Sequence, residues 1–264
     1  MEILGFVLAV FMGFTLGLLG GGGSILTVPI LVYVLSINPV LATAYSLFVV
    51  GATSVVGSVR KSTQGLVNWK VGLIFAIPSL LAVFATRYWL VPAIPEELFT
   101  LGNFIFTKNI GIMVFFGLVM LLASYSMIKG RKESKTQESI QFNLPVILLE
   151  GLLVGVVTGL VGAGGGFLIV PALVILVRLP IKTAVGTSLI IISIKSLIGF
   201  LGDLGSGQAI DWIFLLSFTG FSIIGMFLGI YATQFVGAGN LKKGFGWFVL
   251  VMGVFIIFKE TLFN

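Results

Sequence analysis

Two glycine clusters are the feature of this sequence best suited to chemistry, because glycine leaves backbone N–H groups open to a ligand. The first, Gly20–Gly23, is followed by Val28-Pro29. The second, Gly162–Gly166, is followed by Val170-Pro171, which lies 142 residues after Val28-Pro29. Each cluster interrupts an apolar run, where every glycine costs a helix roughly 1 kcal/mol relative to alanine. Non-helical backbone at membrane depth is tolerated only where protein buries it or where it lines a wet cavity. Matched interruptions in two halves indicate the binding site of a membrane transporter.

The chemistry expected at these clusters is anion binding. We expect Ser24 and Gly166 to begin short helices, whose free N–H groups and positive dipole ends point at a buried anion. Ser24 can also cap its helix. The alternative is close helix packing, which uses glycines spaced by four, as in Gly13-x-x-x-Gly17. Runs of glycines break helices instead, so we assign the site to Gly22, Gly23, Ser24, Gly164, Gly165 and Gly166.

Hydroxyl side chains follow each cluster at equivalent positions. Tyr45-Ser46 corresponds to Thr187-Ser188, and Ser54 corresponds to Ser196. At helical spacing Ser46, Thr53 and Ser54 share one face, and hydroxyls on such a face can donate to an oxyanion. The alternative is interhelical hydrogen bonding, which is common for Ser and Thr in membranes. We therefore add Tyr45, Ser46, Thr187 and Ser188 to the candidate site and leave both roles open.

Lys195 and Glu150 are the charged residues that fall within predicted spans. An intramembrane charge is costly and indicates function, and Lys195 beside an anion would compensate its charge. Glu150 is read as the only buried acid and could accept a coupling proton. Snorkelling to the nearer membrane surface, or a structural pair for Lys195, is the alternative.

The composition indicates a polytopic membrane protein. Of the 264 residues, 58% are hydrophobic and 9% charged, and the mean hydropathy is +1.20, whereas soluble domains carry about 25% charged residues. The absence of Cys and His removes disulfides and the commonest metal ligand, so we expect no metal and no cofactor. The net charge of +6 is assigned to membrane orientation rather than to nucleic acid, because the basic residues lie in short loops.

A duplication organises the chain. Aligning residues 13–65 with residues 155–207 gives 17 identities in 53 positions without a gap, including matched Gly, Pro and Ser. We predict an all-α fold of two inverted repeats, each a glycine-interrupted helix pair plus three transmembrane helices. The predicted repeats are residues 1–128 and 144–264, joined by a cytoplasmic linker, 129–143. Residues 92–108 are expected to form an exposed loop.

Basic residues predict the orientation. With the linker inside and each interrupted pair returning to its own side, 11 Lys and Arg lie inside and 3 lie outside. If each pair crosses once, the split becomes 8 against 6. The first arrangement places both termini outside, with Arg87 and Asp203 at the outer surface. Asn68-Trp69 and Asp211-Trp212 are expected to be helix caps with interfacial tryptophans.

With these motifs, the sequence resembles the sulfite exporter TauE/SafE family of membrane permeases over nearly the whole chain. The resemblance is carried by Gly20–Gly23 to Pro29, Gly162–Gly166 to Pro171, and Ala184-Val185-Gly186-Thr187-Ser188-Leu189. The first half departs from the last pattern, with Tyr45 in place of Thr187, so the halves are expected to line the site asymmetrically. The family implies export or uptake of sulfur-containing anions such as sulfite or organosulfonates.

The sequence therefore predicts a secondary transporter, an exporter of small sulfur-containing oxyanions across the cytoplasmic membrane. Carriage of another small anion or metabolite, or a membrane subunit without transport activity, is the alternative. A metal carrier lacks His, Cys and paired acids, and an enzyme lacks a nucleophile–base cluster. The expected partners are the oxyanion and the lipid bilayer but no nucleic acid, and homo-oligomerisation is left open.

Overall fold

The structure is a computed structural model that describes residues 2–101, 104–129, 144–175, 177–205, 209–233, 235 and 238–262. It is 85% helical, and six of its helices are long and apolar enough to span a membrane. The predicted class, an all-α polytopic membrane protein, is confirmed. Residues 130–143 of the predicted linker lie outside the described residues.

The described residues form sixteen helices, helical turns and strands. In chain order they are α1 (Glu2–Leu19), the 3₁₀ turn η1 (Gly22–Leu26), α2 (Thr27–Pro29), the π turn η2 (Ile30–Val34), α3 (Pro39–Thr63), α4 (Trp69–Ala85), the π turn η3 (Thr86–Leu90), α5 (Val91–Ala93), β1 (Glu97–Leu101), β2 (Phe104–Thr107), α6 (Lys108–Lys129), α7 (Leu144–Val161), α8 (Gly166–Ile175), α9 (Ile181–Leu204), α10 (Trp212–Ala232) and α11 (Ala238–Leu262).

The predicted loop at residues 92–108 is partly wrong, because β1 and β2 pair there as an antiparallel hairpin. Phe99 and Phe106 face each other across it with ring centroids 4.7 Å apart. Cross-strand aromatic pairs stabilise a hairpin that composition alone does not reveal. The helix before the hairpin also extends into the predicted loop, since α4, η3 and α5 form one apolar run from Trp69 to Ala93.

The predicted caps are confirmed. The Asn68 side chain accepts the N–H of Val71 at the start of α4, and Asp211 accepts that of Phe214 at the start of α10. Each side chain satisfies one of the orphan donors of its helix. These two helices begin at equivalent places of the two halves.

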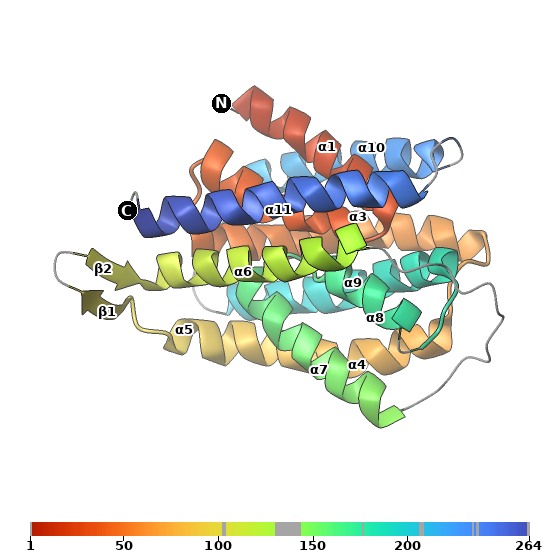
Figure 1. Ribbon diagram of the computed structural model, residues 1–264, viewed down its shortest axis with the longest axis horizontal. Coiled ribbons are helices and arrows are strands. Elements are labelled where there is room, and N and C mark those ends of the chain that lie inside the picture. The colour runs from red at the N-terminus through yellow and green to blue at the C-terminus, as the bar shows by residue number, and fades with distance from the viewer. Residues whose placement is uncertain are drawn as a thin grey trace.

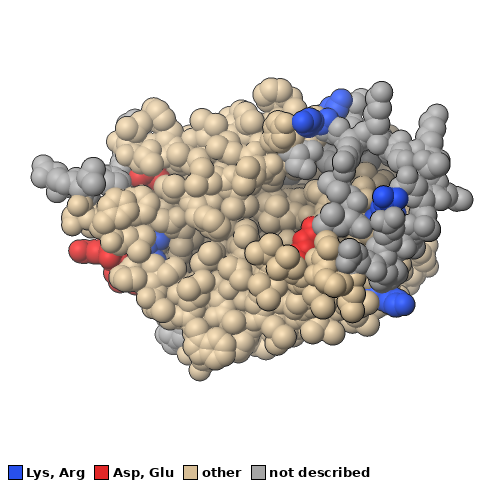
Figure 2. Space-filling view, turned by 60° about the horizontal axis from the view of Figure 1, so that its bottom comes forward, with Lys and Arg blue, Asp and Glu red and all other residues tan. Residues whose placement is uncertain are grey.

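The helices run along the long axis of the molecule, and its two ends differ in charge. Figure 1 shows the start of α1, the end of α11 and the β1–β2 hairpin at one end, which we call the hairpin end. Most of the Lys and Arg side chains in Figure 2 gather at the opposite end, here called the basic end. A one-sided distribution of Lys and Arg is typical of a membrane protein with a fixed orientation.

Helices of one half pack on helices of the other, and each such contact recurs with the roles of the two halves exchanged. We call this the exchange rule. α1 packs on α10 and, equivalently, α7 packs on α4, while α3 packs on α9 and α6 on α11. Glycines permit the first two contacts: a Cβ on Gly13 would lie 1.9 Å from the Ser222 carbonyl oxygen, and one on Gly155 would lie 2.5 Å from that of Ser79. The packing role considered for the glycines spaced by four is therefore confirmed at these positions.

The two short helices after the glycine clusters end in the same way. Ser36 and Arg178, 142 residues apart, both have a positive φ, of 54° and 60°. The next residue in each half donates its N–H six residues back, from Ile37 to Leu31 and from Leu179 to Leu173. Each short helix therefore ends in a residue of left-handed conformation, followed by a wide turn closed by a backbone hydrogen bond. The two segments therefore share a backbone conformation at positions 142 residues apart.

Candidate functional site

The two glycine clusters meet backbone to backbone in the middle of the fold. A Cβ added to Gly21 would lie 2.7 Å from the Cα of Gly166, and one added to Gly166 would lie 2.4 Å from the Cα of Gly21. Gly164 and Gly165 have φ of 63° and 64°, a region that favours glycine. We call this contact of Gly20–Gly23 with Gly162–Gly166 the glycine crossing.

The exchange rule also holds around the glycine crossing. A Cβ on Gly20 would lie 2.1 Å from a side-chain carbon of Val185, and one on Gly162 would lie 2.5 Å from the Cα of Thr43. Gly20 and Gly162 are 142 residues apart, as are Thr43 and Val185. Each cluster therefore rests on the long helix of the opposite half, α9 or α3.

The predicted helix starts are correct for one cluster and wrong for the other. Gly166 begins α8, as expected, whereas η1 begins at Gly22 and not at Ser24. The Ser24 hydroxyl donates to the Gly21 carbonyl oxygen at 2.7 Å, so it does not cap the helix. The reason is that Gly21, with φ of 148°, turns the chain directly into a 3₁₀ turn, which encloses Ser24.

Lys195 lies beside the glycine crossing and is fully buried. Its Nζ donates to the Thr158 hydroxyl oxygen at 2.9 Å and lies 2.8 Å from where a Cβ on Gly165 would be. An ammonium has three donors, and among the described residues Thr158 is its one hydrogen-bond partner. A buried lysine amine with one partner has further donors to offer, and in its protonated form it is suited to binding an anion. Thr158, which the sequence did not single out, is recognisable as a hydroxyl directly before Gly159.

Four buried hydroxyls have no hydrogen-bond partner in the described part of the chain: Ser46, Thr53, Ser54 and Ser196. Thr53 and Ser54 lie level with Lys195 on the neighbouring helix, because Gly51 of α3 packs on Leu197 and Gly57 of α3 packs on Leu189. A buried hydroxyl without a partner costs about 1–3 kcal/mol, which a ligand with acceptor oxygens would relieve.

The other predicted hydroxyls have partners within the protein. Tyr45 accepts the backbone N–H of Asp211 at 2.7 Å, and Thr187 accepts that of Asn68 at 2.9 Å. Each therefore holds the helix cap of the opposite half. Ser188 donates to the Gly20 carbonyl, 2.6 Å away. Thr187 is eight residues from Lys195, about 12 Å along α9, so it lies outside the immediate surroundings of Lys195.

The interpretation of Glu150 as the only buried acid is wrong. Its side chain is half-buried on α7, while Asp203 and Glu260 are 2% and 6% exposed. Sequence reasoning placed Asp203 in an outer loop, yet α9 continues through it to Leu204. Glu260 accepts the Tyr33 hydroxyl at 2.8 Å and so ties the end of α11 to η2.

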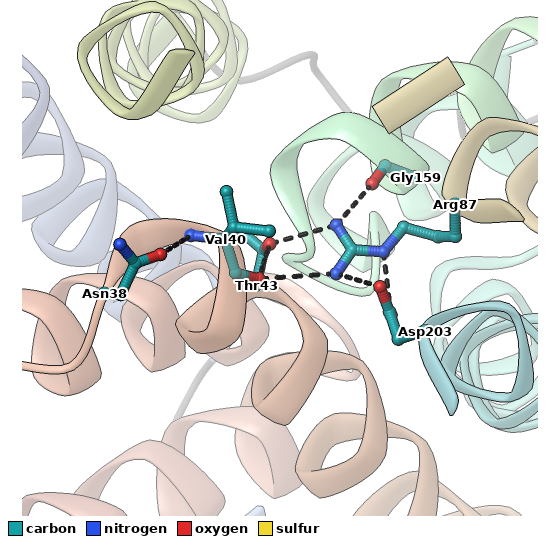
Figure 3. Close-up of polar contacts among 6 residues, drawn as sticks. All are labelled: Asn38, Val40, Thr43, Arg87, Gly159 and Asp203. Carbon is teal, nitrogen blue, oxygen red and sulfur yellow. Dashed lines mark hydrogen bonds and ion pairs between the residues drawn. The ribbon is translucent and has the colours of Figure 1, made fainter. Parts of the chain in front are cut away.

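Arg87 and Asp203 form an ion pair that sequence reasoning missed, because it placed both at the outer surface. Their side chains are 0% and 2% exposed, and Nη2 of Arg87 lies 2.8 Å from Oδ1 of Asp203 (Figure 3). The two residues are 116 positions apart and belong to different halves, so no local motif marks them. The signal available was that each ends an apolar run of spanning length.

The glycine crossing is closed in this structure, since backbone fills it. An apolar groove of about 730 Å³ lies elsewhere, between α4–α5 and α7, with Pro78, Trp89 and Leu152 in its lining. It lacks the buried cation and the unpartnered hydroxyls of the crossing. Binding of a ligand at the crossing would therefore require the two halves to separate there. In transporters built from repeats, alternating access moves one repeat against the other in this way.

The comparisons with known proteins agree with this architecture. The profile of the family described as "Sulfite exporter TauE/SafE" matches residues 5–256. The chain belongs to the TauE/SafE family. It is 32% identical over 254 residues to a "Probable membrane transporter protein" of Xylella fastidiosa, strain 9a5c, covering 94% of this chain and 92% of the relative. The protein YunE of Bacillus subtilis, strain 168, with the same description, is 29% identical over 81% of this chain and 83% of its own.

A third relative, a "Probable membrane transporter protein" of Haemophilus influenzae, is 28% identical over 94% of each chain. No solved structure matches the chain significantly. This TauE/SafE protein is a multi-pass membrane transporter and not an enzyme. It therefore works in a lipid bilayer on a small-molecule substrate.

Proposed function

We propose that this TauE/SafE protein is a secondary transporter that exports small sulfur-containing oxyanions, such as sulfite or organosulfonates, across the cytoplasmic membrane. The observation that carries the proposal is Lys195, a fully buried ammonium beside Gly165 with a single hydroxyl partner among the described residues. The anion would lie at the glycine crossing, against the backbone of Gly22, Gly23 and Gly164–Gly166. Of the predicted hydroxyl donors, Ser46 has no hydrogen-bond partner among the described residues, so its hydroxyl is available to an anion; Ser24, Tyr45, Thr187 and Ser188 would change partners to take part.

The charge around Lys195 favours an anion over a cation. Within the described residues no three acidic side chains gather into a metal site, and Asp203 is paired with Arg87. A hard cation needs several carboxylate or carbonyl oxygens, whereas Lys195 and the start of α8 both offer positive charge.

We further propose that the halves are inverted, with the hairpin end and both termini outside. The exchange rule supports inversion, because the equivalent helices α6 and α11 pack together while α6 begins and α11 ends at the hairpin end (Figure 1). The gathering of Lys and Arg at the basic end supports the orientation. The family's description as a sulfite exporter supports the proposed direction of transport.

Binding to the purified protein tests the substrate class. Calorimetric titration with sulfite, sulfate, thiosulfate, a small organosulfonate and matched metal chlorides should give heats of binding for one or more sulfur oxyanions and none for the cations. Binding of a metal cation, with no response to any oxyanion, would overturn the proposal.

A further inference from the structure

The buried pair of Arg87 and Asp203 lies outside the site described above and calls for an explanation of its own. Nε of Arg87 donates to Oδ2 of Asp203 at 2.8 Å, and Nη2 lies 2.8 Å from Oδ1, so the guanidinium and the carboxylate form a bidentate ion pair. Well-packed apolar residues in place of such a buried pair are often equally or more stabilising. Stability alone therefore does not account for the pair.

The remaining donors of Arg87 are also occupied. Nη1 donates to the Thr43 hydroxyl at 3.0 Å and to the Gly159 carbonyl at 3.2 Å, and Nη2 lies 3.5 Å from the Val40 carbonyl. All five N–H groups thus have acceptors, of which the carboxylate is the one anion. A planar fork that fits a carboxylate fits two oxygens of a sulfite or sulfonate group in the same way. Asp203 occupies the place that an oxyanion would take.

The pair lies between the glycine crossing and the surface of the hairpin end. On the inner side, Thr43 packs against Gly162, and Gly159 lies three residues before Gly162 in the sequence. On the outer side, the Thr43 hydroxyl donates to the Val40 carbonyl, and the Val40 N–H donates to the exposed Asn38 side chain. Figure 3 shows these groups as a continuous polar chain from Asn38 to Gly159. This chain of polar groups crosses an otherwise apolar part of the protein.

The other half carries no such pair at the equivalent place. With the offset of 142, Asp203 corresponds to Lys61, and with the offset of 143 between the two caps, Arg87 corresponds to Ile230. Ile230 packs beside Gly17, which is the counterpart of Gly159. Since the duplicated fold forms without the pair at one end, the pair serves a need specific to the hairpin end.

We propose that Arg87 is a second oxyanion-binding residue, on the route between the glycine crossing and the hairpin end, and that the Asp203 carboxylate fills its anion position while this route is closed. An oxyanion leaving the crossing displaces the carboxylate, and Asp203 returns once the oxyanion has left. Asp203 is one residue before the end of α9 at Leu204, so a short movement brings the displaced carboxylate to the end of its span. The inference rests on the proposed function, because it needs an oxyanion that moves through the protein.

Asp203→Asn tests the proposal, with Asp203→Glu as the matched control. Removing the competing carboxylate should tighten methanesulfonate binding tenfold or more in calorimetric titration, while the control stays within threefold of the parent. Arg87→Met should weaken binding at least tenfold with Lys195 intact. If Asp203 only stabilised the fold, Asp203→Asn would destabilise the protein but would not tighten ligand binding.

A cysteine reporter covers the case in which Asp203→Asn fails to fold. The chain has no cysteine, so Ala163→Cys, fully buried in the crossing, gives a single reactive site. Arg87→Lys keeps the charge but loses the bidentate contact with Asp203. In the Ala163→Cys background it should raise the rate at which maleimide labels the cysteine from the hairpin end at least tenfold over that of Ala163→Cys alone. Parent-like labelling in Arg87→Lys, or parent-like affinity in folded Asp203→Asn, would overturn the inference.

If the parent binds methanesulfonate and Lys195→Met weakens that binding, the proposed function stands regardless of these results. A parent that binds no oxyanion would overturn both the inference and the proposed function.

Discussion

Lys195 is the single residue on which the anion site depends most. Its ammonium is fully buried, and Thr158 satisfies one of its three donors. Replacing it with methionine keeps an unbranched side chain, shorter by one atom, and removes the charge. We expect Lys195→Met to lose a charged hydrogen bond worth about 1.5–3 kcal/mol, which is roughly ten- to a hundredfold in oxyanion affinity.

Glu150→Gln is the matched comparison, because Glu150 is half-buried on a different helix, α7. We expect it to change oxyanion affinity less than Lys195→Met does, since Glu150 does not compensate the anion. Calorimetric titration of both variants gives the comparison. An affinity within twofold of the parent for Lys195→Met would assign Lys195 to structure.

Gly166 offers a second test at the residue scale, through the close approach of the two backbones. A Cβ there would lie 2.4 Å from the Cα of Gly21, and backbone cannot move aside cheaply. We expect Gly166→Ala to lower the free energy of unfolding by about 1–3 kcal/mol, as overpacking does, and to reduce transport. Gly220→Ala is the control, since a Cβ there meets nothing within 4 Å, and it should be neutral or stabilise by up to about 1 kcal/mol. Equal stability of the two variants in thermal unfolding would show that the crossing is looser than described.

At the scale of elements, the two halves hold each other's helix caps. Thr187 of α9 accepts the N–H of Asn68, and Tyr45 of α3 accepts that of Asp211. Thr187→Val keeps the shape but removes the acceptor, which leaves a backbone donor unpaired. We expect the free energy of unfolding to fall by about 1–3 kcal/mol and oxyanion affinity to change less than in Lys195→Met. Unchanged thermal stability, combined with a larger loss of affinity, would instead make Thr187 a direct ligand.

The sequence predicted those elements that have a local signature. Glycine runs, the caps Asn68 and Asp211, and apolar runs of spanning length each depend on neighbouring residues, so the spans and the caps were found. The pairing of Arg87 with Asp203 depends on how α9 packs against η3, which no local pattern encodes. The distribution of basic residues placed Arg87 at the outer surface, so a partner inside the protein was not expected. Ser24 was misassigned because its place within a 3₁₀ turn depends on the φ of Gly21.

At the scale of the whole molecule, the charge difference between the ends predicts the orientation. We expect the hairpin end outside and residues 129–143 in the cytoplasm. Single cysteines at Leu98, which is 42% exposed on β1, and at Ser139 test this in a chain without other cysteines. An impermeant maleimide added to intact cells should label Leu98→Cys but not Ser139→Cys, and permeabilisation should expose Ser139→Cys. Labelling of Ser139→Cys from outside would reverse the orientation.

The most direct test of the central claim is the flux of radiolabelled sulfite in proteoliposomes that contain the purified protein. The parent should move sulfite faster than protein-free vesicles, excess organosulfonate should compete, and Gly220→Ala should match the parent. Lys195→Met, reconstituted at the same density, should move at least tenfold less at a sulfite concentration below saturation. Flux by the parent no faster than in protein-free vesicles, or flux by Lys195→Met equal to that of the parent, would contradict an oxyanion site at the glycine crossing.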